Sequence, residues 1–273
     1  NFLGQRYRTK QQDGTYLGGI MISYIVAFRN KSYAFKRVAF FLSIAYSIML
    51  IIVTFGASVP TMSSCITNAI TYYFPDISPI AISLFLMRIF YIFIFNGLKA
   101  VGRFGQIVVP PMLLLYICGC TFIIIYHSNY FIEAIAVIFK CAFAPEAVLG
   151  SAAGITIVGA MKQGFARALY SNEAGTGASS ILSSTAKAPN TSSQGLIAMT
   201  AVFWDTLIIG SLTGVTVVVF QLSNGGINFQ GIESGYDLIS STFGTMDFIG
   251  MLFINVTIIL FAGTTLLTDP TYA

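Results

Sequence analysis

Residues 38–56 read VAFFLSIAYSIMLIIVTFG, a stretch without a charged side chain. A helix needs about 20 mostly apolar residues to cross a bilayer, so this stretch predicts a membrane-spanning helix. Comparable windows recur further along the chain, at residues 79–97, 107–126, 196–220 and 248–268, with a weaker, glycine-rich window at 147–161. The sequence therefore predicts an all-α polytopic membrane protein with about six transmembrane helices.

The overall composition agrees with a chain that lies largely in lipid. Hydrophobic residues make up 56% of the sequence, charged residues make up 9%, and the mean hydropathy is +0.80. Soluble domains carry about a quarter charged residues. The sequence has no GxSxG or HExxH motif, and its four cysteines lack the spacing with histidine that a zinc site needs. We therefore expect no enzyme, no bound cofactor and no zinc site.

Charge between the predicted spans indicates an orientation. Twelve of the 14 basic residues fall in the N-terminal segment and in the loops on the same side of the membrane. Loops rich in Lys and Arg stay in the cytoplasm, so we expect a multi-pass protein of the cell (inner) membrane with its N-terminal segment inside. The net charge of +4 is explained by these loops and does not indicate nucleic-acid binding.

The glycine-rich window is a candidate binding region. It contains a run of small residues, Gly150, Ser151, Ala152, Ala153 and Gly154. Such residues let helices approach closely in a membrane. They also suit a broken helix whose free backbone N–H and C=O groups line a substrate cavity. Glycine interruption alone does not separate the two possibilities.

Polar residues after this window form two further candidates. Residues 164–180 read GFARALYSNEAGTGASS, in which Asn172, Glu173 and Gly175 either cap a short helix or form a gate. This run is no nucleotide-binding loop, because it lacks the lysine and hydroxyl that follow the glycines of such a loop. Asp205 and Thr206 lie inside an apolar window, where they serve either a helix-end contact or ion coupling.

Hydroxyl groups near the end of the last window suggest a cation site. The Phe261 carbonyl and the hydroxyls of Thr264 and Thr265 lie within one helical turn and offer three oxygens to a small hard cation such as Na⁺. The alternative is that both threonines donate hydrogen bonds to the preceding turn of their own helix.

Five ordered segments together resemble the alanine or glycine:cation symporter family. They are QRYRTKQQDGTYLGGIM (5–21), FNGLKAVGRFGQIVVPPMLLLYI (95–117), AFAPEAVLGSAAG (142–154), the SNEAGTG run in 164–180, and QGLIAMTAVFWDTLIIGSLTGV (194–215). The resemblance implies part of a five-plus-five inverted-repeat, LeuT-like transporter fold. Residues 1–273 would form a single transmembrane transporter domain, truncated at both ends, that holds the third to eighth of about eleven helices.

The resemblance also implies roles for individual residues. The backbone of residues 150–154 would contact the amino and carboxylate groups of the substrate, with Thr265 and Asp269 in the same pocket. Phe261, Thr264 and Thr265 would bind sodium. Asp269 stands where the family has a tryptophan, which either enlarges or charges the pocket or reflects an alignment that frays near the end of the chain.

The function implied by the resemblance is sodium-coupled symport of a small neutral amino acid, alanine or glycine, by alternating access. The expected partners are the amino acid, Na⁺ as the coupling ion and the lipid bilayer. Two alternatives stay open at this point. One is a proton-coupled or uncoupled carrier of another amino acid on the same fold, in which Asp205 or Asp269 titrates. The other is a channel or a non-transporting membrane sensor.

Overall fold

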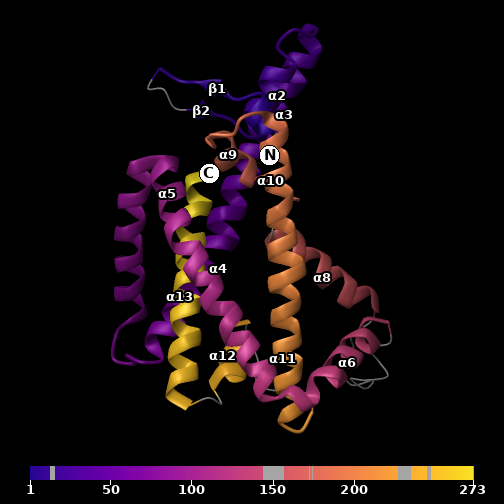
Figure 1. Cartoon of the computed structure of the whole chain (residues 1–273). Coiled ribbons are helices and arrows are strands. Elements are labelled where there is room, and N and C mark those ends of the chain that lie inside the picture. The colour runs from indigo at the N-terminus through magenta and orange to yellow at the C-terminus, as the bar shows by residue number, and fades with distance from the viewer. Residues whose placement is uncertain are drawn as a thin grey trace. The chain divides into compact units, whose positions relative to one another are not determined.

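The computed structural model describes residues 1–12, 16–143, 157–171, 173, 175–226, 235–244 and 247–272, most of which are helical (Figure 1). A short antiparallel pair of strands, β1 (Thr9–Lys10) and β2 (Tyr16–Leu17), lies near the N-terminus, with Thr9 opposite Leu17. Among the described residues, four helical stretches are long and apolar enough to cross a membrane: Tyr33–Thr71, Ala100–Tyr126, Thr191–Ser223 and Phe248–Thr271. The prediction of a predominantly helical, multi-pass membrane protein is therefore confirmed.

The predicted windows map onto these helices unequally. Windows 38–56, 107–126, 196–220 and 248–268 each lie inside one of the four stretches. The window at 79–97 coincides with the shorter apolar helix Pro79–Phe93. That helix and the next window belong to one helical run, α5 (Pro79–Tyr126), which turns back on itself in Figure 1, purple on the way up and magenta on the way down.

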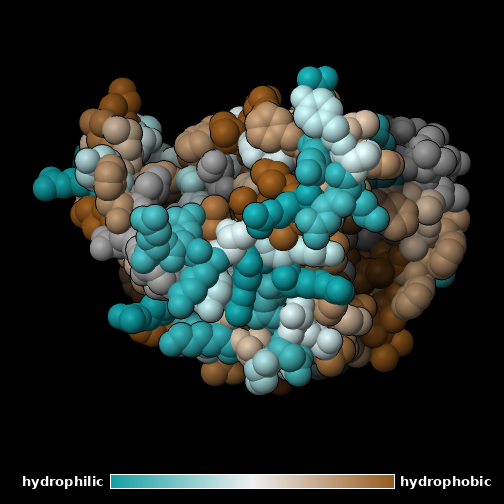
Figure 2. All heavy atoms as spheres, turned by 90° about the horizontal axis from the view of Figure 1, so that it is seen from above, coloured by the Kyte–Doolittle hydropathy of each residue, from teal (hydrophilic) through white to brown (hydrophobic). Residues whose placement is uncertain are grey.

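Many large apolar side chains face outward, as lipid contact requires. Phe41, Met49 and Ile52 of the first span are 60–70% exposed. Figure 2 shows the face seen from above, on which hydrophilic side chains gather while hydrophobic ones lie around them. Large apolar side chains exposed along a long helix are typical of a helix that contacts lipid.

The chain divides into two compact units. Unit 1 comprises residues 1–110, 173–202 and 258–273. Its elements are β1, β2, α1 (Phe2–Arg6), α2 (Ile20–Ala27), α3 (Tyr33–Val53), η1 (Thr54–Ser58), α4 (Val59–Thr71), the first part of α5, α9 (Ser179–Ser184), α10 (Thr191–Val202) and the last part of α13 (Asp247–Tyr272).

A π-helical turn joins α3 to α4 within unit 1. In this turn, η1, the N–H of Val59 bonds to the carbonyl of Thr54 instead of the usual residue four positions back. Pro60 follows directly in the first turn of α4, and proline neither donates a backbone hydrogen bond nor tolerates the carbonyl four residues before it. The wider turn accommodates Pro60, so the helical run continues to Thr71.

Within the part of the chain that the structure describes, two apolar clusters belong to the core of unit 1. One joins Leu50 of α3 to Ala178 and Ile181 around α9, and the other joins Ile66 of α4 to Ala262 and Leu266 of α13. The N-terminal segment also packs tightly on α9. A Cβ added to Gly4 would lie 2.7 Å from the carbonyl oxygen of Ser180, so the close approach requires glycine there.

Unit 2 comprises residues 111–172 and 203–257. It contains the rest of α5, η2 (Ser128–Tyr130), α6 (Phe131–Phe143), α8 (Ile157–Ser171), η4 (Phe203–Gly210), α11 (Ser211–Ser223), α12 (Gly235–Gly244) and the first part of α13. Its core includes Cys120, Val219 and Ile254, which are at most 1% exposed. Buried Asn255 joins α12 to α13 by accepting a 2.9 Å hydrogen bond from the hydroxyl of Tyr236.

The glycine-rich window is the least tested part of the sequence prediction. Helix α6 precedes it and was not predicted as an element, and α8 begins at Ile157, inside the predicted span 147–161. The candidate substrate-binding run Gly150–Gly154 lies outside the described residues. Both readings of that run, close helix packing and a broken helix, therefore stay predictions, as does the inverted-repeat fold.

Candidate functional site

Glu173 lies at the centre of a polar cluster in unit 1. Among the described residues it is the only non-glycine with a left-handed backbone, at φ 54°. Its carbonyl accepts a 2.9 Å hydrogen bond from the N–H of Gly177, which closes the turn that leads into α9. The backbone N–H of Ser179, in the first turn of α9, bonds to its carboxylate. Glu173 thus contacts the turn before α9 through its carbonyl and the first turn of α9 through its carboxylate, and its predicted capping or gating role stays a prediction.

Asp269 of α13 lies close enough to Glu173 for the two carboxylates to repel each other. The hydroxyl of Ser58 donates a hydrogen bond to Oδ2 of Asp269. Ser58 belongs to the π-helical turn η1 and is only 2% exposed. Two elements distant in sequence, together with the turn before α9, therefore bring two acids and one hydroxyl together in unit 1.

The environment of Glu173 favours its protonated form. Burial, and to a smaller extent the negative charge of Asp269, raise the pKa of its carboxyl to about 7, against the opposing effect of the Ser179 N–H. The Oε2 atom of Glu173 is buried and has no hydrogen-bond partner in the described part of the chain. A carboxyl in this environment exchanges a proton near neutral pH.

The predicted sodium ligands lie together on one side of α13. The hydroxyls of Thr264 and Thr265 donate to the Phe261 carbonyl at 2.8 and 3.1 Å. All three residues are half-buried. The arrangement fits both sequence readings, because back-bonded hydroxyls keep lone pairs that a cation can use. Asp269 follows Thr265 by one helical turn, on the same side of the helix.

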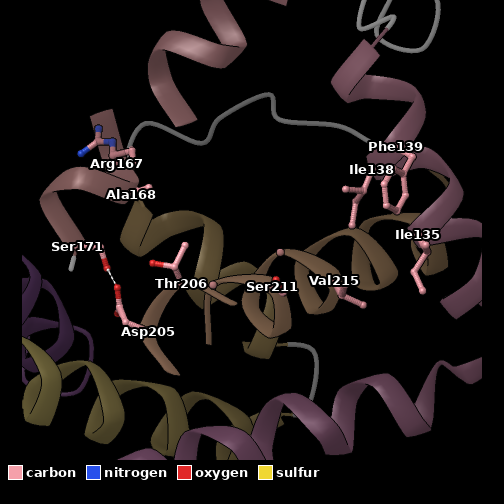
Figure 3. Close-up of a pocket in the computed structure, with 12 residues that line it drawn as sticks. Ile135, Ile138, Phe139, Arg167, Ala168, Ser171, Asp205, Thr206, Ser211 and Val215 are labelled. Atoms are coloured by element: carbon pink, nitrogen blue, oxygen red, sulfur yellow. Dashed lines mark hydrogen bonds between the residues drawn. The ribbon is translucent and has the colours of Figure 1, made fainter. Parts of the chain in front are cut away.

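A second polar group lines a cavity of about 690 Å³ in unit 2. The Ser171 hydroxyl of α8 donates a 2.7 Å hydrogen bond to Oδ2 of Asp205 in the π-helical segment η4. Figure 3 shows Ser171, Asp205 and Thr206 together at one end of this cavity, with the apolar side chains of α6 at the other end. The cavity therefore has one polar end and a largely hydrocarbon wall.

Comparison with known proteins decides the family. The family model of the sodium:alanine symporter family matches residues 1–273. The chain belongs to the sodium:alanine symporter family. It is therefore a member of a family of transporters and not of enzymes, and the resemblance seen in the SNEAGTG and QG…DT segments is confirmed.

Several members of the sodium:alanine symporter family and related transporters are moderately similar to this chain in sequence. The chain is 29% identical over 262 residues to an uncharacterized transporter of Haemophilus influenzae, which covers 94% of this chain and 56% of the relative. It is 28% identical over 270 residues to the sodium/alanine symporter AgcS of Methanococcus maripaludis, over 97% and 56% of the two chains. It is 28% identical over 274 residues to the putative sodium/proton-dependent alanine carrier protein YrbD of Bacillus subtilis, over 97% and 54%. The chain thus spans about half the length of these curated relatives.

Within this symporter family member, the predicted site residues fall into separate groups. Glu173, Thr265 and Asp269 lie in unit 1, whereas Asp205 and Thr206 lie in unit 2. Gly175 is exposed in the turn before α9. Asn172 and residues 150–154 lie outside the described residues. The roles of all these residues stay predictions.

The sequence alone did not single out Ser58 or Ser171, the two serines that donate hydrogen bonds to Asp269 and Asp205 in this symporter family member. Ser58 ends an apolar run two residues before Pro60, and only that proline hinted at an irregular turn. Ser171 precedes Asn172 within the family motif, but nothing in the motif pointed to Asp205 as its partner.

Proposed function

We propose that the full-length protein carries out sodium-coupled symport of a small neutral amino acid, alanine or glycine, across the cell membrane by alternating access. The family match over residues 1–273 carries this proposal. The name of the Methanococcus maripaludis relative, a sodium/alanine symporter, supports both the ion and the substrate. The excess of basic residues in alternate loops supports a cytoplasmic N-terminal segment.

The proposed sodium site uses one carbonyl and two hydroxyls of α13. Hard cations take about six oxygen ligands, and Phe261, Thr264 and Thr265 offer three of them from adjacent turns. Bound Na⁺ would favour the substrate-accepting state because it binds that state more tightly, which couples the ion to the amino acid.

The proposed substrate site uses the backbone of residues 150–154 together with Thr265 and Asp269. The carboxylate of Asp269 lies one turn from Thr265 and attracts an ammonium group, as the amino group of an amino acid requires. Asn172, Glu173 and Gly175, and separately Asp205 and Thr206, are proposed as gating or structural positions. The turn that Glu173 stabilises ahead of α9 supports such a role for it.

Liposomes that contain the full-length protein test the proposal. Labelled alanine or glycine should accumulate under an inward Na⁺ gradient and fail to accumulate without one. Thr264→Val should weaken the dependence on Na⁺. Thr200→Val is a matched control, because Thr200 makes the same kind of 2.7 Å back-bond to Ile197 in α10. Uptake indifferent to Na⁺ would contradict the ion assignment.

A second candidate function is proton-coupled transport. It is favoured by Glu173, whose pKa of about 7 lets it bind and release a proton near neutral pH beside Asp269. The name of the Bacillus subtilis relative, a putative sodium/proton-dependent alanine carrier, points the same way. Uptake driven by a pH gradient in the absence of Na⁺, and abolished by Glu173→Gln, would establish this alternative.

A further inference from the structure

The corner between α2 and α3 carries a concentrated positive charge. Four basic residues, Arg29, Lys31, Lys36 and Arg37, lie within nine positions, and all four are exposed. The sequence contains no acidic residue between Asp13 and Asp76. Within the described residues none of the four side chains takes part in an ion pair. We refer to residues 28–37 as the basic corner.

Aromatic side chains accompany these cations. Phe28 and Phe35 stack with their ring centroids 6.2 Å apart. The guanidinium of Arg37 lies 4.7 Å from the ring centroid of Tyr33. The rings are not hidden, since Tyr33 is 70% and Phe35 is 56% exposed. Exposed rings beside cations are typical of the layer in which lipid headgroups meet hydrocarbon.

The backbone of the basic corner is fixed by consecutive turns. The N–H of Lys31 bonds to the Phe28 carbonyl at 3.1 Å, and the N–H of Lys36 bonds to the Ser32 carbonyl at 3.1 Å. Helix α3 then begins at Tyr33, which is also the first residue of the span Tyr33–Thr71. The four cations are therefore held at the end of a membrane span, where headgroup phosphates lie. Figure 2 looks onto the end of the molecule at which Figure 1 labels α2 and α3.

We propose that the basic corner binds the phosphate of anionic lipid headgroups, with Tyr33 and Phe35 inserted beside the lipid. The phosphate chemistry alone would also suit a free phosphate ion. The exposed rings and the position at the end of a span favour the lipid, because a soluble anion gains nothing from either. The inference depends on the membrane placement of α3 and not on which ion or amino acid is transported.

Native mass spectrometry of the full-length protein tests this inference in micelles that hold phosphatidylglycerol and phosphatidylcholine in equal amounts. The wild-type protein should retain mainly phosphatidylglycerol. Replacing Arg29, Lys31, Lys36 and Arg37 with Gln should lower the ratio of bound phosphatidylglycerol to bound phosphatidylcholine at least about fivefold. This minimum is the effect expected from the loss of a single basic contact to an anionic surface. The paired variant Arg29→Gln/Lys31→Gln should give an intermediate ratio.

The matched control removes the same charge elsewhere, by changing Lys10, Arg103, Lys162 and Lys187 to Gln, and should leave the ratio unchanged. A lipid ratio that survives the loss of the basic corner, or that falls equally in the control, overturns the proposal. Inorganic phosphate is the third arm. If phosphate alone displaces phosphatidylglycerol, the site recognises a free anion and the lipid assignment is wrong.

Discussion

The two units each join an acid to a serine beside a π-helical turn, but the surroundings of the acids differ. In unit 1, buried Ser58 of η1 bonds to Asp269, and Glu173 places a second carboxyl nearby. In unit 2, exposed Ser171 bonds to Asp205 of η4 at the edge of a cavity. The same kind of serine–acid hydrogen bond thus lies beside a second carboxyl, whose pKa burial raises, in unit 1, and involves an exposed serine in unit 2. Such π-helical turns are frequent at functional sites.

The largest expected effect concerns Glu173→Gln and the pH dependence of stability. The folded protein holds the Glu173 proton up to a pKa of about 7, whereas the ordinary pKa is 4.5. The folded state therefore binds more protons than the unfolded state between these values, so the stabilising contribution of protonated Glu173 is fully present below about pH 4.5 and is lost as the pH rises to about 7. The loss amounts to about 3 kcal/mol, and Glu173→Gln should remove it.

Thermal unfolding in detergent across this pH range measures the effect. Glu133→Gln changes an exposed carboxyl of α6 in the same way and is the matched control. A wild-type profile that is flat between pH 4.5 and 7 would contradict the distinction between the two units.

Ser58→Ala should have the next largest effect. It leaves the half-buried carboxylate of Asp269 without the hydroxyl that donates to it, which costs about 1–3 kcal/mol of unfolding free energy. The loss of stability should be largest at high pH, where both acids are charged. Ser58→Thr keeps the hydroxyl and separates the loss of the hydrogen bond from the change in packing.

Asp269→Asn should shift the pH dependence of stability to lower pH without abolishing it. Without the negative charge of Asp269, the pKa of Glu173 falls, and the decline in stability should begin at lower pH. The change should be smaller than that of Glu173→Gln, because burial, the larger cause of the raised pKa, remains. The midpoint of the unfolding profile measures it, and an upward shift would show that the two acids do not interact as described.

Ser171→Ala should have the smallest effect. Ser171 is exposed, so water replaces the lost partner of Asp205, and we expect a loss of only about 0.5–1 kcal/mol. Comparison with Ser58→Ala tests whether the loss of unfolding free energy depends on the burial of the serine or only on the loss of its hydrogen bond. Equal losses for the two serines would remove the contrast between them.

The sequence was a good guide to the spans and a poorer guide to the irregular elements between them. Runs such as residues 38–56 are apolar on all sides, and such runs have few stable places other than a bilayer. Helix α6 was missed because it is short and its apolar residues did not form a window long enough to span. The substrate-binding prediction for residues 150–154 remains as the sequence left it.

Composition, loop charge and motif order thus determined by themselves that this is a helical membrane protein of the sodium:alanine symporter family. These properties depend only on the residue types and their order along the chain, so they can be read without knowing which residues are in contact. Only the tertiary structure decided that Ser58 donates a hydrogen bond to Asp269, that Asp269 lies near enough to Glu173 to raise its pKa, and that Ser171 donates a hydrogen bond to Asp205. Burial and charge coupling depend on distances between residues far apart in the sequence, and those distances exist only after the helices have packed.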